Sequence, residues 1–162
     1  MDWSRTLRAL LTLAVIVAMS YAAWSYLEHT NDPSPTTPNT PLLHVTILKD
    51  GDSWVASDGR EYRLGMVNAP EALERCGRDA TLFTSHFLAD GFTAETYSKD
   101  VHGRQVAEVF NPSGDSLNVA LVEAGYSDDR YLDNFRHENA GLARRLDDAF
   151  NRAATPSCRR TP

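Results

Sequence analysis

Residues 43–67, LHVTILKDGDSWVASDGREYRLGMV, decide the fold, because three short β-rich runs follow one another here with turn signals between them. The runs at 43–48, 53–57 and 60–67 are rich in β-branched and aromatic residues, which favour strands. Asp50-Gly51-Asp52 is a turn signal between the first two runs, and Asp58-Gly59 is a strong hairpin signal between the second and third. The stretch therefore predicts three consecutive strands joined by turns.

The rest of the domain continues with elements of both kinds. Two more strands are expected at 92–97 and 105–110, and helices are expected at 78–89, 116–124 and 136–153. The helical segments place apolar residues on one face, which is typical of helices that cover a core. The sequence therefore predicts an α+β, mainly β, fold: a five-stranded OB-fold Greek-key barrel with three helices, preceded by an N-terminal transmembrane helix.

An apolar segment near the N-terminus indicates the compartment. Residues 9–26, ALLTLAVIVAMSYAAWSY, carry no charge and are just long enough to cross a bilayer core at about 1.5 Å rise per residue. Two arginines precede the segment and two acidic residues follow it, so the positive-inside bias leaves the N-terminus in the cytoplasm. We expect a single-pass anchor over residues 1–28; a signal peptide cleaved after small residues is the alternative. Both interpretations place the rest of the chain outside the cytoplasm.

Behind this segment, residues 29–41 (HTNDPSPTTPNTP) contain four prolines among Thr and Asn. Such a composition is typical of an extended linker that cannot bury a core. We expect one domain over residues 42–158 and a short tail at 159–162, because 162 residues with 42% hydrophobic content suffice for one core.

The charge and the cysteines limit the possible functions. A net charge of -6 argues against a tight nucleic-acid binder, since such proteins usually carry a basic face. Cys76 and Cys158 lack the clustered spacing of a zinc site. In an exported protein, an even cysteine count points to a disulfide.

Five short motifs follow one another along the domain. They are Asp50-Gly51-Asp52-Ser53, Tyr62-Arg63-Leu64, Val67-Asn68-Ala69-Pro70-Glu71, residues 99–107 (KDVHGRQVA) and residues 117–125 (LNVALVEAG). In this order and spacing they resemble the staphylococcal nuclease (thermonuclease) family, over about residues 43–154. The resemblance implies an OB-fold domain that hydrolyses phosphodiester bonds of nucleic acid with the help of calcium.

The resemblance also implies roles for individual residues. Arg63 and Arg104 are expected to clamp the phosphate, because a planar guanidinium donates two hydrogen bonds at once. Glu71 is the expected general base, and Tyr131 is expected to contact a nucleobase. Taken singly, each residue also fits a structural role, such as a solvated turn or a helix start, so only their combination indicates catalysis.

Calcium binding depends on the two remaining residues of the expected site. Asp52 is implied as a calcium carboxylate and Asn68 as a second ligand. The family usually has an aspartate at the position of Asn68; asparagine keeps an oxygen ligand but removes one negative charge, which lowers calcium affinity. This departure leaves an alternative function: a weak or inactive nuclease-like module that binds nucleic acid or a protein partner.

The resembling fold further implies that the loop holding Cys76 and the end of the last helix approach one another. We therefore expect a Cys76–Cys158 disulfide, with two free thiols as the alternative. Such a bond closes a loop of about 80 residues and stabilises by about 4 kcal/mol in the chain-entropy treatment. The expected protein is a monomer that contacts single- or double-stranded nucleic acid, and the membrane through its N-terminal helix.

Overall fold

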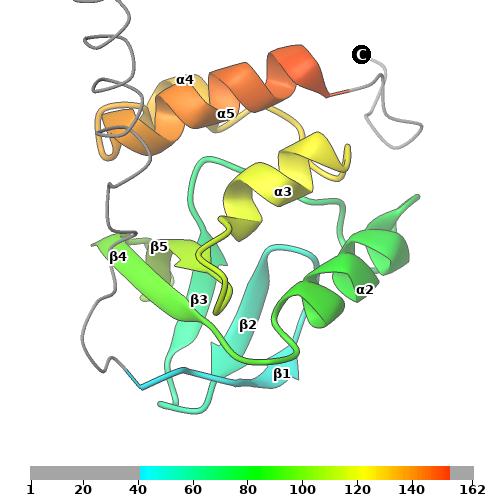
Figure 1. The fold of residues 1–162 in the computed structure, drawn as a ribbon, viewed down its shortest axis with the longest axis vertical. Coiled ribbons are helices and arrows are strands. Elements are labelled where there is room, and N and C mark those ends of the chain that lie inside the picture. Colours follow the sequence, from blue (N-terminus) through cyan, green and yellow to red (C-terminus); the bar gives the residue numbers. More distant parts are fainter. Residues whose placement is uncertain (1–40, 154–162) are drawn as a thin grey trace, which may run out of the picture. The chain divides into compact units, whose positions relative to one another are not determined.

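Five strands form one mixed sheet in the order β1-β2-β3-β5-β4 (Figure 1). The structure is a computed structural model, and it describes residues 41–153. The strands are β1 (Val45–Leu48), β2 (Ser53–Ala56), β3 (Glu61–Leu64), β4 (Thr93–Lys99) and β5 (Gln105–Phe110). Each lies where the sequence predicts a strand, so the predicted five strands are confirmed.

The pairing within the sheet changes direction once. β1, β2 and β3 pair antiparallel, with Trp54 opposite Tyr62, and β5 pairs antiparallel with β4. β3 and β5 run parallel, with Arg63 opposite Val106. The parallel pair places the end of β3 beside the middle of β5, which is where the candidate site lies.

The two edges of the sheet meet next to β1 and β4. Leu43 and Phe92 exchange backbone hydrogen bonds of 2.9 and 2.8 Å, just before these two strands begin. Phe92 also packs edge-to-face on Trp54 and Tyr62, with ring centroids 5.6 and 5.7 Å away, and all three side chains are buried. The strand order and this closure are consistent with the predicted OB-fold barrel.

β3 is shorter than the sequence predicts. The run 60–67 suggests one strand, but β3 ends at Leu64 because the chain turns at Gly65 and Met66, and Met66 adopts a positive φ of 61°. The residues after this turn leave the sheet, and Asn68 forms an isolated antiparallel bridge with Asp128. The turn carries Asn68 and Glu71 away from the strand and toward the candidate site.

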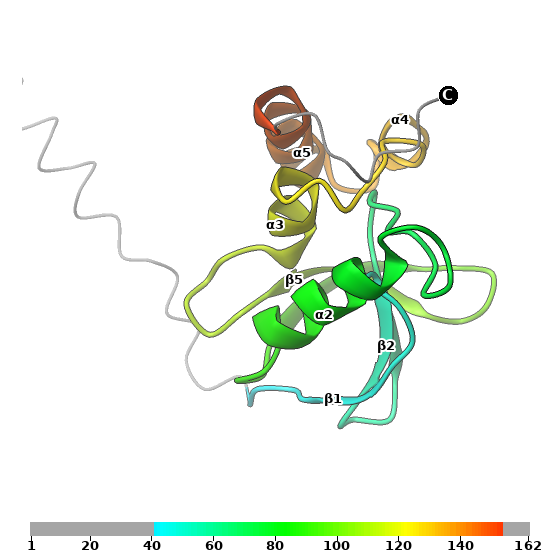
Figure 2. The ribbon, with the colours of Figure 1, turned by 90° about the vertical axis from the view of Figure 1, so that its right-hand side faces the viewer.

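The helices of the described residues are α2 (Gly77–Phe87), α3 (Leu117–Glu123), α4 (Leu132–Phe135) and α5 (Ala140–Arg152). Figures 1 and 2 show α3 lying between the sheet and α5, while α2 lies beside the strands β1 and β2. The predicted helices at 78–89 and 116–124 correspond to α2 and α3. The predicted helix at 136–153 begins too early, and the prediction of three helices misses α4.

The prediction that the last helix starts at residue 136 is wrong, because Asn139 caps α5 and the helix begins at Ala140. Its backbone has a non-helical φ of -148°, and its side chain accepts a hydrogen bond from the backbone N–H of Leu142. Such a side-chain acceptor satisfies an N–H that lacks a partner in the first turn of a helix. Arg136 follows α4 and pairs with both Asp133 and Asp147, so it joins α4 to α5 across the break.

Two buried polar residues connect the helices to the sheet. Asn118 on α3 is fully buried; its Oδ1 accepts from the backbone of Val109 at 3.1 Å, and its Nδ2 donates to the carbonyls of Gly65 and Ala107. Glu108 on β5 is buried as well and pairs with Arg145 of α5. These contacts hold β3 and β5 in register beneath α3 and α5.

Within residues 41–153, no helix has both the length and the apolar character needed to span a bilayer. The predicted anchor at 1–28, all but the last residue of the predicted linker, and the tail lie outside the described residues, as does Cys158. The anchor and the Cys76–Cys158 disulfide therefore stay predictions.

Candidate functional site

The turn between β1 and β2 fixes the backbone around Asp52. The carboxylate of Asp50 accepts hydrogen bonds from the backbone N–H groups of Asp52 and Ser53 at 2.9 and 2.7 Å, and from the Ser53 hydroxyl. Thr84 of α2 donates to the carbonyl of Gly51 at 2.6 Å. Asp50 therefore makes the turn, which leaves the carboxylate of Asp52 available for other contacts.

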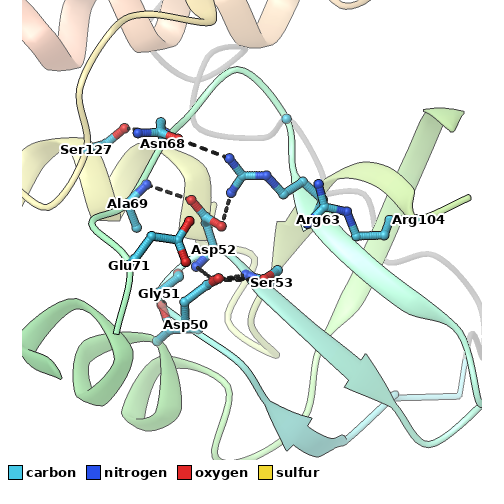
Figure 3. A network of polar contacts seen from close by, with 12 residues as sticks. Asp50, Gly51, Asp52, Ser53, Arg63, Asn68, Ala69, Glu71, Arg104 and Ser127 are labelled. Carbon is cyan, nitrogen blue, oxygen red and sulfur yellow. Dashed lines mark hydrogen bonds and ion pairs between the residues drawn. The ribbon is translucent and has the colours of Figure 1, made fainter. Parts of the chain in front are cut away.

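Asp52 and Arg63 form a buried ion pair at the centre of the site (Figure 3). The side chains are only 5% and 15% exposed, and the second carboxylate oxygen of Asp52 accepts from the backbone N–H of Ala69 at 2.6 Å. Burial and the nearby charge of Arg104 lower the pKa of Arg63, although Asp50, Tyr131 and Glu71 oppose this shift. The guanidinium nevertheless stays charged at neutral pH.

Asn68 continues this contact network beyond Arg63. Its Oδ1 accepts from Arg63 at 3.3 Å, and its Nδ2 donates to the carboxylate of Asp128 at 3.1 Å. Its backbone N–H donates to the Ser127 hydroxyl at 2.9 Å (Figure 3). Arg63 thus spans the two residues expected to bind calcium, Asp52 and Asn68.

Arg104 is held by the turn that precedes β5. Its Nε donates to the Asp100 carboxylate at 2.6 Å, and its backbone N–H donates to the other oxygen at 3.0 Å. Burial raises the pKa of Asp100, but the hydrogen bonds from Arg104 and His102 outweigh it and lower that pKa below its ordinary value. The ion pair uses Nε alone of the guanidinium nitrogens, so it is compatible with a phosphate on the terminal nitrogens.

Glu71 is the exposed member of the group. It follows the loop of Asn68 and Ala69, and Figure 3 shows its side chain on the same side of the loop as Asp52. Its charge opposes the lowering of the Arg63 pKa, so the two groups lie within electrostatic range. The structure therefore brings Asp52, Arg63 and Asn68 into contact, with Arg104 and Glu71 close enough to act on Arg63.

A cleft of about 390 Å³ opens beside these arginines. Arg63 and Arg104 line one part of it, and the aromatic rings of Tyr131 and Phe135 line another, with centroids 6.1 Å apart. The Arg63 guanidinium carbon lies 6.0 Å from the centre of the Tyr131 ring, as in a cation–π contact. Tyr131 and Phe135 are 36% and 39% exposed, so both offer an accessible ring face or edge.

The candidate ligands of the site are all oxygen atoms, as calcium prefers, but they carry less negative charge than a calcium site with a second carboxylate at position 68. Calcium prefers several oxygen ligands, and the site offers the carboxylate of Asp52, the amide oxygen of Asn68 and the exposed carboxylate of Glu71. Within the described part of the chain, no three His, Cys, Asp or Glu side chains are close enough to hold a metal ion. An all-oxygen set with an amide in place of one carboxylate fits calcium with reduced affinity.

Asp100 and Asp128 are not among the residues predicted from the sequence, although both lie beside predicted residues. Asp100 lies four positions before Arg104 across a glycine turn, and this local spacing could have indicated the pair. Asp128 lies 60 positions from Asn68, so no local pattern could have indicated that contact. Cys76 precedes α2, where it adopts a positive φ of 63°.

Two curated proteins are similar in sequence to part of this chain. An "Uncharacterized endonuclease" of Escherichia coli O157:H7 is 30% identical over 89 residues, which cover 51% of this chain and 58% of the relative. "Succinoglycan biosynthesis protein ExoI" of Rhizobium meliloti (strain 1021) is 28% identical over 106 residues, 58% of this chain and 55% of the relative. The chain spans about half the length of the curated relatives it matches.

A family match includes most of the candidate site. Residues 61–153, more than half of the chain, match the family described as "Staphylococcal nuclease homologue". This region includes both arginines, Glu71 and the aromatic side of the cleft. Because the match extends from β3 through α5, the chain belongs to the staphylococcal nuclease family.

Proposed function

We propose that this chain hydrolyses phosphodiester bonds of DNA or RNA with the help of calcium. The observation that carries the proposal is the buried Asp52–Arg63 pair beside Arg104, at the edge of a cleft lined by aromatic rings. The charge of Arg104 lowers the pKa of Arg63, so the two guanidinium groups are close enough to create a locally positive potential. This potential favours binding of a phosphodiester despite the overall charge of -6.

The arginines would bind the phosphate and stabilise the charge that develops on it. Arg63 is 15% exposed, so little water competes with its hydrogen bonds to the non-bridging oxygens. Arg104, fixed by Asp100 through Nε, would direct its terminal nitrogens toward the phosphate and the leaving oxygen. Bound calcium would supply further charge neutralisation at the phosphate oxygens. Asp52 and Asn68 are the residues that would hold it.

Glu71 would accept a proton from the attacking water. Its exposed position lets the carboxylate contact a water molecule from the solvent. The water oxygen forms a bond to phosphorus as its proton passes to Glu71, and the bond from phosphorus to the 5′ oxygen breaks. The 5′ oxygen then takes a proton from solvent, so that charge and atoms balance.

The aromatic side of the cleft would hold the bases. Bases stack on exposed aromatic rings regardless of sequence, at about 1–3 kcal/mol per base. Tyr131 and Phe135 therefore favour single-stranded or locally opened substrate without sequence preference. The acidic surface favours weak binding that depends on calcium, in a chain that works as a monomer.

The compartment is proposed from the sequence alone. The uncharged segment 9–26 and its flanking charges favour a single-pass protein with the domain outside the cytoplasm; a secreted form after signal cleavage is the alternative. High extracytoplasmic calcium suits a site with reduced ligand charge.

Cleavage of labelled single-stranded DNA by the purified full chain tests the enzymatic proposal. We expect cleavage in calcium that stops with chelator, and a loss of at least 100-fold in rate for Glu71→Gln, as is typical of a lost general base. Glu95→Gln is the matched control, since Glu95 is exposed on β4 and does not line the cleft. Equal rates for both variants would exclude Glu71 as the base.

Two observations favour a second function. Both carboxylate oxygens of Asp52 already have protein partners, Arg63 and the backbone of Ala69, and Asn68 lacks a charge. These contacts suit a module that binds nucleic acid or a protein partner without turnover. Binding of DNA without cleavage, unchanged by Asn68→Asp, would support this second function over the first.

A further inference from the structure

The carboxylate of Asp128 lies directly behind the amide of Asn68. The Nδ2 of Asn68 donates to Asp128 at 3.1 Å, while its Oδ1 faces Arg63 on the other side. The backbones are joined as well, because Asp128 donates its N–H to the carbonyl of Asn68 at 3.1 Å. Ser127 accepts from the Asn68 N–H and donates to the Asp128 carbonyl. The loop after α3 therefore places a negative charge next to Asn68, in the segment that follows β3.

We propose that Asp128 supplies the negative charge that Asn68 lacks, so that the two side chains act as one divided calcium ligand. The amide oxygen of Asn68 would hold the cation, and the carboxylate of Asp128 lies on the other side of that amide. This inference rests on the proposed calcium-dependent function and adds a residue from a different loop to that site.

The hydrogen bond between the two side chains does two things. It fixes the amide so that Nδ2 faces Asp128 and Oδ1 faces Arg63 and the site, which is the orientation a cation requires. It also draws electron density toward Oδ1 of Asn68. An amide whose N–H donates to a carboxylate is polarised, so that its own carbonyl oxygen becomes more negative. Partners behind the ligands commonly change metal affinity by 10- to 100-fold.

Arg130 is the group that opposes this effect. Its guanidinium pairs with Asp128 at 2.8 Å and also donates through Nε at 3.0 Å. The Arg130 side chain is 46% exposed, whereas that of Asp128 is 24% exposed, so water screens the pair and weakens it. Arg130 therefore reduces the electrostatic effect of the Asp128 charge on the site without cancelling it.

Asp128 could instead serve only to hold the loop in place, and Asp128→Asn separates the two roles. The new amide keeps an oxygen that accepts from Asn68 Nδ2, and the backbone bridge remains. The change removes the charge and one of the two oxygens that accept from Arg130. A purely structural role predicts unchanged calcium affinity for this variant, whereas a divided ligand predicts a loss.

Calcium titration calorimetry on the full chain without nucleic acid tests the proposal. We expect Asp128→Asn to weaken calcium binding by about tenfold or more. The exchanged variant Asn68→Asp/Asp128→Asn restores the charge count and the hydrogen bond in reverse, so its affinity should return to at least that of the original chain. Arg130→Gln should strengthen calcium binding, whereas Asp128→Asn should weaken it.

Two results would overturn this inference alone. Asp128→Asn that binds calcium as tightly as the original chain shows that the charge of Asp128 does not act on the ion. An exchanged variant that stays as weak as Asp128→Asn shows that the two positions do not share one role. If the original chain binds calcium and cleaves DNA in either case, the proposed function stands and only the divided ligand fails. An original chain that binds no calcium and cleaves no DNA overturns both proposals.

Discussion

Replacing Arg63 by glutamine should destabilise the protein because it leaves Asp52 buried without its counterion. The Asp52 side chain is 5% exposed and would keep one hydrogen bond, from the backbone of Ala69. Removing one partner of a buried ion pair typically costs about 3–5 kcal/mol. The remaining hydrogen bond places this case near the lower end, at about 3 kcal/mol, or roughly 12 °C in melting temperature at about 4 °C per kcal/mol.

Thermal and urea unfolding with chelator present measure this loss. Arg60→Gln is the matched control, because the Arg60 side chain is 66% exposed and lies 3.8 Å from Asp58, so its loss should change stability by less than about 0.5 kcal/mol. Adding Asp52→Asn to Arg63→Gln should recover part of the stability, since no buried charge is then unpaired. Calcium should also reduce the loss if the cation takes the place of the guanidinium beside Asp52. An Arg63→Gln chain as stable as the Arg60→Gln control would refute the reasoning.

Three further predictions concern the cleft. Asp100→Asn should lower the cleavage rate about tenfold while the fold persists, because Arg104 loses its carboxylate partner; single-turnover kinetics and circular dichroism measure the two effects. The pKa of Asp100 is lowered in the folded state, so its stabilising effect is present above the unfolded value of about 3.9 and is lost as pH falls through the lower folded value. Melting curves of Asp100→Asn and the original chain should therefore differ at neutral pH and converge in acid; a constant difference would contradict this assignment. Tyr131→Leu should weaken binding of single-stranded DNA by about 1–3 kcal/mol, measured by fluorescence anisotropy, and no change would exclude stacking on this ring.

Local patterns in the sequence predicted the strands well, because each strand has its own evidence. Trp54 and Tyr62 lie in alternating runs, and turn residues such as Gly59 separate these runs. The end of β3 could not be predicted in this way: Met66 takes a left-handed backbone that its side chain does not indicate. Tertiary contacts, such as the bridge between Asn68 and Asp128, determine the path there.

The break between α4 and α5 shows a different limit. The segment before Ala140 is polar and charged, so it continues an exposed helix face as readily as it forms a loop. Asn139 sets the start of α5 by capping the helix through the backbone N–H of Leu142. Asparagine also occurs within helices, so this residue alone does not predict the helix start.

The candidate site was predicted through the family resemblance rather than through periodicity. The structure brings Asp52, Arg63 and Asn68 into direct contact, and it places Arg104 close enough to Arg63 to lower its pKa. The pairing of Asp52 with Arg63 could not be foreseen, because each residue alone is compatible with a turn or an exposed strand position. Their chemical roles stay predictions until the variants are measured.

The contacts of Asn118 have a consequence for how such domains change over evolutionary time. Its three hydrogen bonds end on main-chain atoms of Gly65, Ala107 and Val109, so they do not depend on the side chains at these positions, although proline could not donate at position 109 and any side chain at position 65 would clash with Tyr97. The architecture beneath α3 is therefore insensitive to which side chains decorate the neighbouring loops. A lineage can exchange an acidic residue for an amide at position 68, or recruit a new acid from a distant loop, and still inherit an intact scaffold on which activity can be lost, weakened or rebuilt.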